Sequence, residues 1–322
     1  MFNGYAEAVK RKREILQKQK NSILEIETHK DKIRELFTIR TAKTQKSLSS
    51  PILGVDSAFA ISRQILNNFY VSIPVSVTLK DGSVSIEDTC YVEEDGNYLE
   101  NILKAISLSG EIRLAAERLN ECSYVFLDGS VSTFMVTLSS GISAALKHKD
   151  SAVAKHFLQI YPDTIYSFKD ILTSGKAIFV PKSSQKTDLR DYILTRTDLP
   201  QIEHISDYGI VMFILEKTEY LKVGTAKLED YKSNKEWIKD IILYDTLNEL
   251  EEIAQAPEVY YMRGLSGYPF KFECFCSFPA DIVLPMTANK EFYITYEADM
   301  EAKDRIQPIL IPESVYEEGV RL

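Results

Sequence analysis

Two short apolar runs that each end in an aspartate constrain this chain most. Asp56 follows the run Ile52–Val55, and Asp128 follows the run Tyr124–Leu127. Apolar runs of this length before turn-forming residues predict buried strands. Open α/β sheets bind their ligands at the carboxyl ends of strands, so we expect the two aspartates to meet at that edge. Paired carboxylates suit Mg²⁺ or Mn²⁺, and this combination indicates phosphodiester chemistry.

The same two segments also have a purely structural interpretation. Asp-Ser and Asp-Gly are ordinary turn sequences, because aspartate bonds its own backbone and glycine accepts a positive φ. The occurrence of two such segments, rather than either one alone, favours the metal-site hypothesis.

Composition limits the class of protein. The chain has 322 residues, of which 45% are apolar and 26% charged, as expected of one large globular domain or two modest ones. It contains no apolar stretch of membrane-spanning length, and its charged N-terminus lacks the apolar core of a signal peptide, so we expect a cytoplasmic protein. Of the four cysteines only Cys274 and Cys276 are close, without the second ligand pair of a zinc site, and we expect reduced thiols.

Charge is distributed unevenly along the chain. The net charge of −9 argues against nucleic-acid binding, yet the segment from Lys10 to Lys46 has twelve Lys/Arg against five Asp/Glu. This asymmetry is typical of a polyanion-binding element, and it is equally compatible with a solvated helix face.

A long N-terminal helix is predicted over residues 5–46, which contain neither proline nor glycine. Its short apolar seam, which includes Leu16, Ile23, Ile26 and Ile33, could pack on the body of the protein or on a second copy. We therefore divide the chain into an N-terminal helical arm at 1–48, for dimerisation or DNA contact, and a catalytic domain at 49–322.

The pattern after the arm predicts one mixed α/β domain, with a mixed sheet flanked by helices. We expect a hairpin around Lys80–Ser83 between two β-rich segments, and a pair of strands on either side of Gly264–Gly267. The further strands are expected at 52–56, 124–128 and 176–180, and the helices at 59–66, 97–122, 134–149, 152–172, 189–195, 245–254 and from 279. An apolar run at 210–215 is left unassigned, and the tail past Pro308 is expected to be loosely ordered.

A two-metal nuclease site needs three or four converging acidic groups. The helix before the second aspartate strand offers Glu111, Glu117 and Glu121, of which Glu111 and Glu117 lie on different helical faces. Asp207 is a further candidate ligand, and Lys182 a candidate phosphate contact. In the alternative interpretation the glutamates are solvated, Asp207 caps a turn and Lys182 is a surface lysine.

Other enzyme classes lack their motifs. The sequence has no G-x-x-x-x-G-K-[ST] phosphate loop, no G-x-S-x-G elbow and no G-x-G-x-x-G fingerprint. The four histidines do not show the H-x-x-x-H spacing of a metal site.

Several segments together resemble the NurA nuclease family. Residues 54–57 (GVDS) look like the first motif of that family, usually written VDGS, with Ser57 in place of its glycine. Residues 125–130 (VFLDGS) match the second aspartate motif closely. Weaker similarities at 179–183, 206–215 and 268–273 extend the resemblance from about residue 50 to residue 280.

The resemblance implies an RNase H-like fold and a Mn²⁺- or Mg²⁺-dependent site, with two ions held by Asp56, Glu111, Asp128 and Asp207. Glu117 is the fallback for Glu111, and Lys182 is implied as a phosphate contact. It further implies a homodimeric nuclease that processes 5′ ends of DNA together with a HerA-type hexameric ATPase, in DNA-end resection or in defence against phage. The family usually has a histidine near the C-terminus, whereas the last histidine here is His204.

Two other functions stay open at the sequence level. The missing histidine and the Ser57 change are compatible with a catalytically inactive adaptor that docks on the ATPase ring. The basic N-terminal segment alone would suit a dimeric nucleic-acid-binding module, although the acidic net charge disfavours it.

Overall fold

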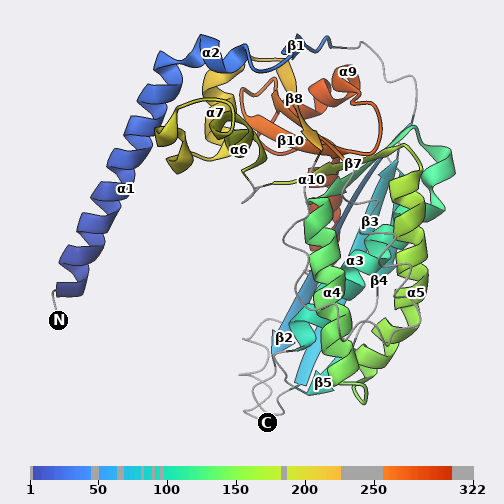
Figure 1. Cartoon of the computed structure of the whole chain (residues 1–322). Helices are drawn as coiled ribbons and strands as arrows, with labels where there is room; N and C mark the ends of the chain where they lie inside the picture. The colour runs from blue at the N-terminus through green and yellow to red at the C-terminus, as the bar shows by residue number, and fades with distance from the viewer. Residues whose placement is uncertain are drawn as a thin grey trace.

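A long mixed β-sheet organises the molecule in a computed structural model (Figure 1). The structure describes residues 3–44, 51–63, 69–80, 83–88, 91–94, 98–182, 187–225 and 257–306. Within these ranges the sheet has ten strands in the order β1-β8-β9-β10-β7-β6-β2-β3-β4, and β5 pairs with β3. The predicted mixed α/β architecture, a sheet flanked by helices, is confirmed.

The centre of the sheet is parallel and its flanks are antiparallel. Strands β2 (Ile52–Arg63), β6 (Tyr124–Asp128) and β7 (Ala177–Val180) run in the same direction. On one side follow β10 (Pro269–Cys274), β9 (Glu258–Arg263), β8 (Glu219–Thr225) and β1 (Arg40–Thr41), and on the other β3 (Phe69–Lys80), β4 (Ser83–Asp88) and β5 (Tyr91–Glu94). The predicted pairings of β3 with β4 and of β9 with β10 are confirmed.

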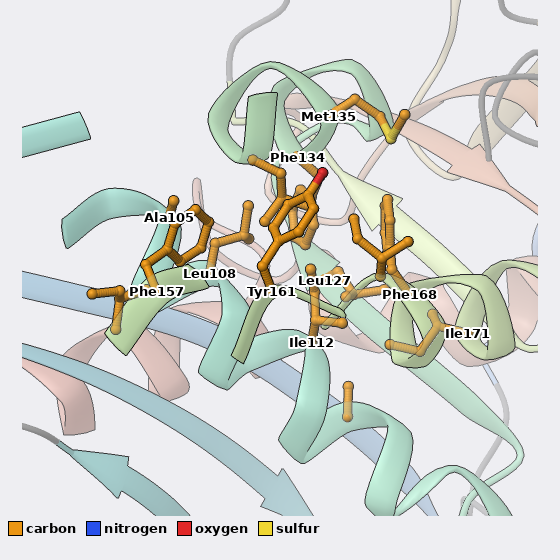
Figure 2. Packing of buried hydrophobic residues seen from close by; sticks show 14 of the residues in the cluster. Ala105, Leu108, Ile112, Leu127, Phe134, Met135, Phe157, Tyr161, Phe168 and Ile171 are labelled. Carbon is orange, nitrogen blue, oxygen red and sulfur yellow. The ribbon is translucent and has the colours of Figure 1, made fainter. Parts of the chain in front are cut away.

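Helices cover both faces because successive strand residues point to opposite sides. Leu127 and Phe179 pack against α3 (Leu99–Glu117), α4 (Val131–Lys147) and α5 (Ala152–Thr173). Figure 2 shows part of this core, in which Leu127 lies among helix residues such as Phe134, Phe157 and Phe168. Phe126 and Val180 point the other way, into a second core with α9 (Ala280–Val283), η5 (Leu284–Thr287) and α10 (Tyr293–Ile306). A third core lies under α6 (Asp188–Leu194), η2 (Pro200–His204) and α7 (Asp207–Ile214).

The N-terminal segment is not the single helix that we predicted over 5–46. Helix α1 (Asn3–Thr28) ends at His29, whose φ of −112° and ψ of 18° are not helical, and a short α2 (Lys30–Arg34) follows. Tertiary contacts outweigh helix propensity here: the Arg34 guanidinium pairs with Glu219, and β1 joins the sheet beside β8. Ile26 and Ile33 are buried against the body, whereas the first half of α1 extends away from it (Figure 1).

The helix predicted over 59–66 is also wrong, because β2 continues to Arg63. The strand keeps its antiparallel pairing with β3 as far as Arg63 opposite Tyr70, and this ladder overrides the local sequence preference. Asp56 therefore lies inside a strand, at the level where the neighbouring parallel strand β6 ends.

The remaining predictions match the structure with small shifts. The helix expected at 97–122 is α3 followed by η1 (Leu119–Glu121), and the unassigned apolar run at 210–215 forms the end of α7 and its C-cap, Leu215. The helix predicted at 245–254, the tail past Pro308 and the boundary at residue 48 lie outside the described residues. Among the described helices, none is long and apolar enough to cross a bilayer.

Candidate active site

The turn after β6 holds Asp128 in place through three local features. Gly129 has a φ of +112°, a backbone conformation that residues with a Cβ rarely adopt, and its N–H donates to the Val180 carbonyl at 3.1 Å. Ser130 is the N-cap of α4 and its hydroxyl accepts from the Thr133 N–H at 3.1 Å. Each residue of the Asp-Gly-Ser sequence thus has a structural task, and the carboxylate projects from the end of the strand.

Asp56 lies next to Asp128 across the parallel pair of β2 and β6. Val55 is opposite Leu127 in this ladder, so the two aspartates are adjacent and the charge of one acts on the other. Asp56 is buried, and its Oδ1 accepts from the Ser57 N–H at 2.7 Å. Burial, reinforced by the charge of Asp128, raises the pKa of the Asp56 carboxyl.

Glu111 is the third acidic group of the cluster and comes from α3. Its side chain is 2% exposed, whereas Glu117 and Glu121 are exposed, so among the three predicted alternatives Glu111 is the buried one that the charges of Asp56 and Asp128 reach. Burial, reinforced by the charge of Asp56, raises the pKa of the Glu111 carboxyl. The Ser57 hydroxyl hydrogen bonds to Glu111, so the residue that replaces the family glycine contacts the acidic cluster directly.

Lys182 follows β7 and reaches into the carboxylate cluster. Its Nζ lies 2.5 Å from Asp128 Oδ2 and 3.5 Å from Asp56 Oδ2. Partial burial works against the charged amine, but the charges of Asp128 and Asp56 outweigh burial and raise the pKa of Lys182. The lysine is therefore a cation at the centre of the cluster.

Asp299 on α10 belongs to the same cluster, and the sequence analysis did not find it. Its Oδ2 lies 3.9 Å from Lys182 Nζ and 2.6 Å from Lys303 Nζ, and the residue is 8% exposed. The close packing of α10 on β2 explains its approach, because a Cβ at Gly54 would lie 2.7 Å from the Ile294 carbonyl oxygen. A glycine two residues before Asp56, inside a predicted strand, is the sequence signal that points to this contact.

The structure does not bring Asp207 into the cluster. Its two carboxylate oxygens accept hydrogen bonds from the N–H groups of Leu189 and Arg190, at 3.1 and 3.0 Å, and from the Tyr261 hydroxyl at 2.5 Å. The carboxylate thus satisfies N–H groups in the first turn of α6, and the structure does not join Asp207 to the other three predicted ligands. Asp207 is instead a buried connection between α6, α7 and β9.

The donor set fits a divalent cation in its chemistry. Three buried carboxylate oxygens lack a hydrogen-bond partner, one each on Asp56, Glu111 and Asp128. Buried polar atoms are normally satisfied, and hard oxygen donors are what Mg²⁺ and Mn²⁺ prefer. The described residues contain no ready-made group of three metal ligands, and Lys182 Nζ stands between the carboxylates.

Comparison with solved structures identifies the fold. The NurA nuclease from Sulfolobus solfataricus superposes with a TM-score of 0.61 over 99% of this chain and 98% of its own, at 15% sequence identity. The chain has a NurA-like fold. A crystal structure of NurA with manganese gives a TM-score of 0.60 at 12% identity, over 94% of this chain and 96% of that one.

A further solved structure, NurA bound to dAMP and manganese, gives a TM-score of 0.60 at 11% identity and covers 91% of this chain and 92% of its own. No protein-family model matches the sequence, and no curated protein matches it significantly. The likeness is therefore one of fold, and the predicted roles of the site residues stay predictions.

Proposed function

We propose that this chain is a divalent-metal-dependent nuclease that hydrolyses phosphodiester bonds in DNA. The observation that carries the proposal is the convergence of Asp56, Glu111 and Asp128, each with a buried oxygen that accepts no hydrogen bond, at the level where β6 of a NurA-like sheet ends. Solved NurA structures that contain manganese, one of them with dAMP, support the choice of metal and substrate class.

In this proposal Asp56, Glu111 and Asp128 hold Mn²⁺ or Mg²⁺, two ions in all, and Asp299 completes the acidic set. Bound divalent cations supply polarisation of the phosphoryl oxygens and an acidified water. Lys182 leaves its position between the carboxylates and its ammonium group contacts the phosphate of the substrate. Ser57 keeps Glu111 oriented through its hydroxyl, and the Gly129 turn keeps Asp128 at the strand end.

The test is cleavage of linear DNA labelled at the 5′ or the 3′ end, with Mn²⁺, Mg²⁺ or EDTA. We expect metal-dependent loss of label by the wild type, abolished in Asp128→Asn and retained in the control Asp150→Asn, which changes an exposed carboxylate. Full activity of Asp56→Ala and Asp128→Ala would refute the assignment. Whether the 5′ or the 3′ label is lost first reports the direction of DNA digestion. We propose that digestion begins at 5′ ends.

We further propose a cytoplasmic homodimer that works with a HerA-type hexameric ATPase in DNA-end resection or phage defence. The same cleavage assay with and without such an ATPase tests the partnership. The second candidate function is a catalytically weak or inactive adaptor of that ATPase, with which Ser57 in the first aspartate segment is compatible. Stimulated ATP hydrolysis without cleavage under any divalent metal would support the adaptor.

A further inference from the structure

A buried ion-pair network lies beside the candidate active site, on strand β10. Lys271 is fully buried, and its Nζ lies 2.6 Å from Asp188 Oδ2 and 3.0 Å from Glu273 Oε1. Burial opposes the charged amine, but Glu273 and Asp188 outweigh burial and raise the pKa of Lys271. Such buried pairs add little net stability, so a geometric role is the better explanation for this one.

One arm of the network reaches the turn that carries Asp128. Glu273 Oε2 accepts a hydrogen bond from the Val131 N–H at 2.9 Å, and Val131 is the first residue of α4. A carboxylate at this point satisfies an otherwise orphaned N–H and complements the helix dipole. Glu273 thus fixes the start of α4 three residues after Asp128.

The other arm reaches the segment that carries Lys182. The Tyr208 hydroxyl donates to the Pro181 carbonyl at 2.7 Å and also hydrogen bonds to the backbone N–H of Lys271. On the far side of Lys182, the ion pair of Asp188 with Lys271 holds the first residue of α6. The backbone is therefore anchored at Pro181, one residue before Lys182, and again at Asp188.

We propose that Glu273, Lys271 and Tyr208 are positioning residues that hold the backbone of Asp128 and the backbone of Lys182 at a fixed separation, while the Lys182 side chain stays free to move. This inference rests on the proposed nuclease function. Strand β10 pairs with β7, so one element contacts the start of α4 after Asp128 and, through Tyr208, the Pro181 backbone before Lys182. A misplacement of about 1 Å in an active site can reduce the rate a hundredfold, which explains the value of such a link.

The two arms predict different kinetic effects. Glu273→Gln loosens the Asp128 turn, and we expect the Kd for Mn²⁺, measured from the electron paramagnetic resonance signal of free Mn²⁺, to rise at least threefold. Tyr208→Phe releases Pro181, and we expect kcat for DNA cleavage to fall at least fivefold while the Kd for Mn²⁺ stays within twofold. Lys271→Met affects both arms and should show both changes.

Tyr260→Phe is the matched control. It removes a phenol on the neighbouring strand β9 that donates to Glu258, outside both arms, and should leave kcat and the Kd for Mn²⁺ unchanged.

The outcomes separate the positioning inference from the proposed function. If the wild type cleaves DNA and both Glu273→Gln and Tyr208→Phe have the kcat and the Kd for Mn²⁺ of the wild type, the positioning inference is overturned while the nuclease function stands. If the wild type neither cleaves DNA nor binds Mn²⁺, the proposed function fails and the inference fails with it. Circular dichroism of each variant identifies misfolding, in which case the milder variant Tyr208→Phe decides.

Discussion

Lys182 places a positive charge among the carboxylates of Asp56, Asp128 and Asp299. Without it, burial and mutual repulsion would disfavour several ionised carboxylates at such short range. The lysine and a divalent cation compete for the same oxygens, so entry of a metal requires the ammonium group to move. Because of this competition, we expect replacement of Lys182 to have opposite effects on DNA cleavage and on the binding of Mn²⁺.

We expect Lys182→Met to reduce DNA cleavage by about a hundredfold, because the variant has no charge to stabilise the transferring phosphate. The same variant should gain more thermal stability from Mn²⁺ than the wild type does, since no ammonium group has to be displaced. Cleavage assays and melting curves with Mn²⁺ or EDTA measure the two effects. Lys149→Met, which removes an exposed lysine outside the cluster, is the control. An equal Mn²⁺-induced shift of Tm in Lys182→Met and the wild type would contradict the competition.

Asp299 is the second residue whose role can be tested singly. We expect Asp299→Asn to weaken Mn²⁺ binding about tenfold, because it removes a carboxylate beside the ligand set, and to lower the cleavage rate accordingly. Asp304→Asn, on the exposed side of the same helix α10, is the matched control. Titration with Mn²⁺ measures both variants. Equal affinities would remove Asp299 from the site.

At the scale of elements, the contact between α10 and β2 decides whether the site is complete. A Cβ at Gly54 would lie 2.4 Å from Ile294 Cγ1 and 2.7 Å from its carbonyl oxygen, so the helix has to move away if Gly54 gains a side chain. The backbone clash cannot be relieved by a change of rotamer at Ile294.

We therefore expect Gly54→Ala to destabilise the protein by about 2–3 kcal/mol through overpacking and to weaken Mn²⁺ binding by displacing Asp299. Urea unfolding and Mn²⁺ titration measure the two effects. Gly54 lies two residues before Asp56, and a variant with unchanged stability would show that α10 is not tightly seated on β2.

At the scale of the whole molecule, the projecting half of α1 provides a basic surface away from the core. Lys10, Lys12 and Arg13 are exposed there. Deletion of residues 1–46 would also remove the buried Ile26 and Ile33 and strand β1, so charge substitution is the cleaner test of the arm.

We expect Lys10→Gln, Lys12→Gln and Arg13→Gln together to weaken DNA binding and to reduce the slope of log K against log salt by about 0.9 for each phosphate that is no longer neutralised. Fluorescence anisotropy at several salt concentrations measures the slope. Lys147→Gln with Lys149→Gln, at the exposed end of α4, is the control. An unchanged slope would show that α1 does not contact DNA.

The same helix exposes Ile15, Leu16 and Leu24, at 56%, 54% and 62%. If these side chains contact a second copy, Leu16→Glu should shift the protein toward the monomer, because a charge in an apolar interface is costly. Sedimentation equilibrium measures the assembly state. A monomeric wild type would contradict the homodimer.

Local chemistry alone encodes a large part of the candidate site. An apolar run, an aspartate, a glycine with positive φ and a capping serine define the end of β6, and each of these preferences acts within a few residues of the chain. For this reason the sequence predicts that Asp56 and Asp128 meet at the ends of neighbouring strands. The structure brings the two together with Lys182, although β2 continues past Asp56.

Only the tertiary structure decides the rest. Asp207 and Asp299 are both acidic residues in helices, yet Asp207 is turned inward by the N–H groups of α6, and Asp299 is carried to the site by α10. The continuation of β2 past Asp56 and the break in the arm at His29 depend likewise on pairing with β3 and on contacts with β8. Interactions between segments distant in the chain set these positions. Apart from Gly54, which indicates that another element packs closely on β2, no local pattern of residues specifies them.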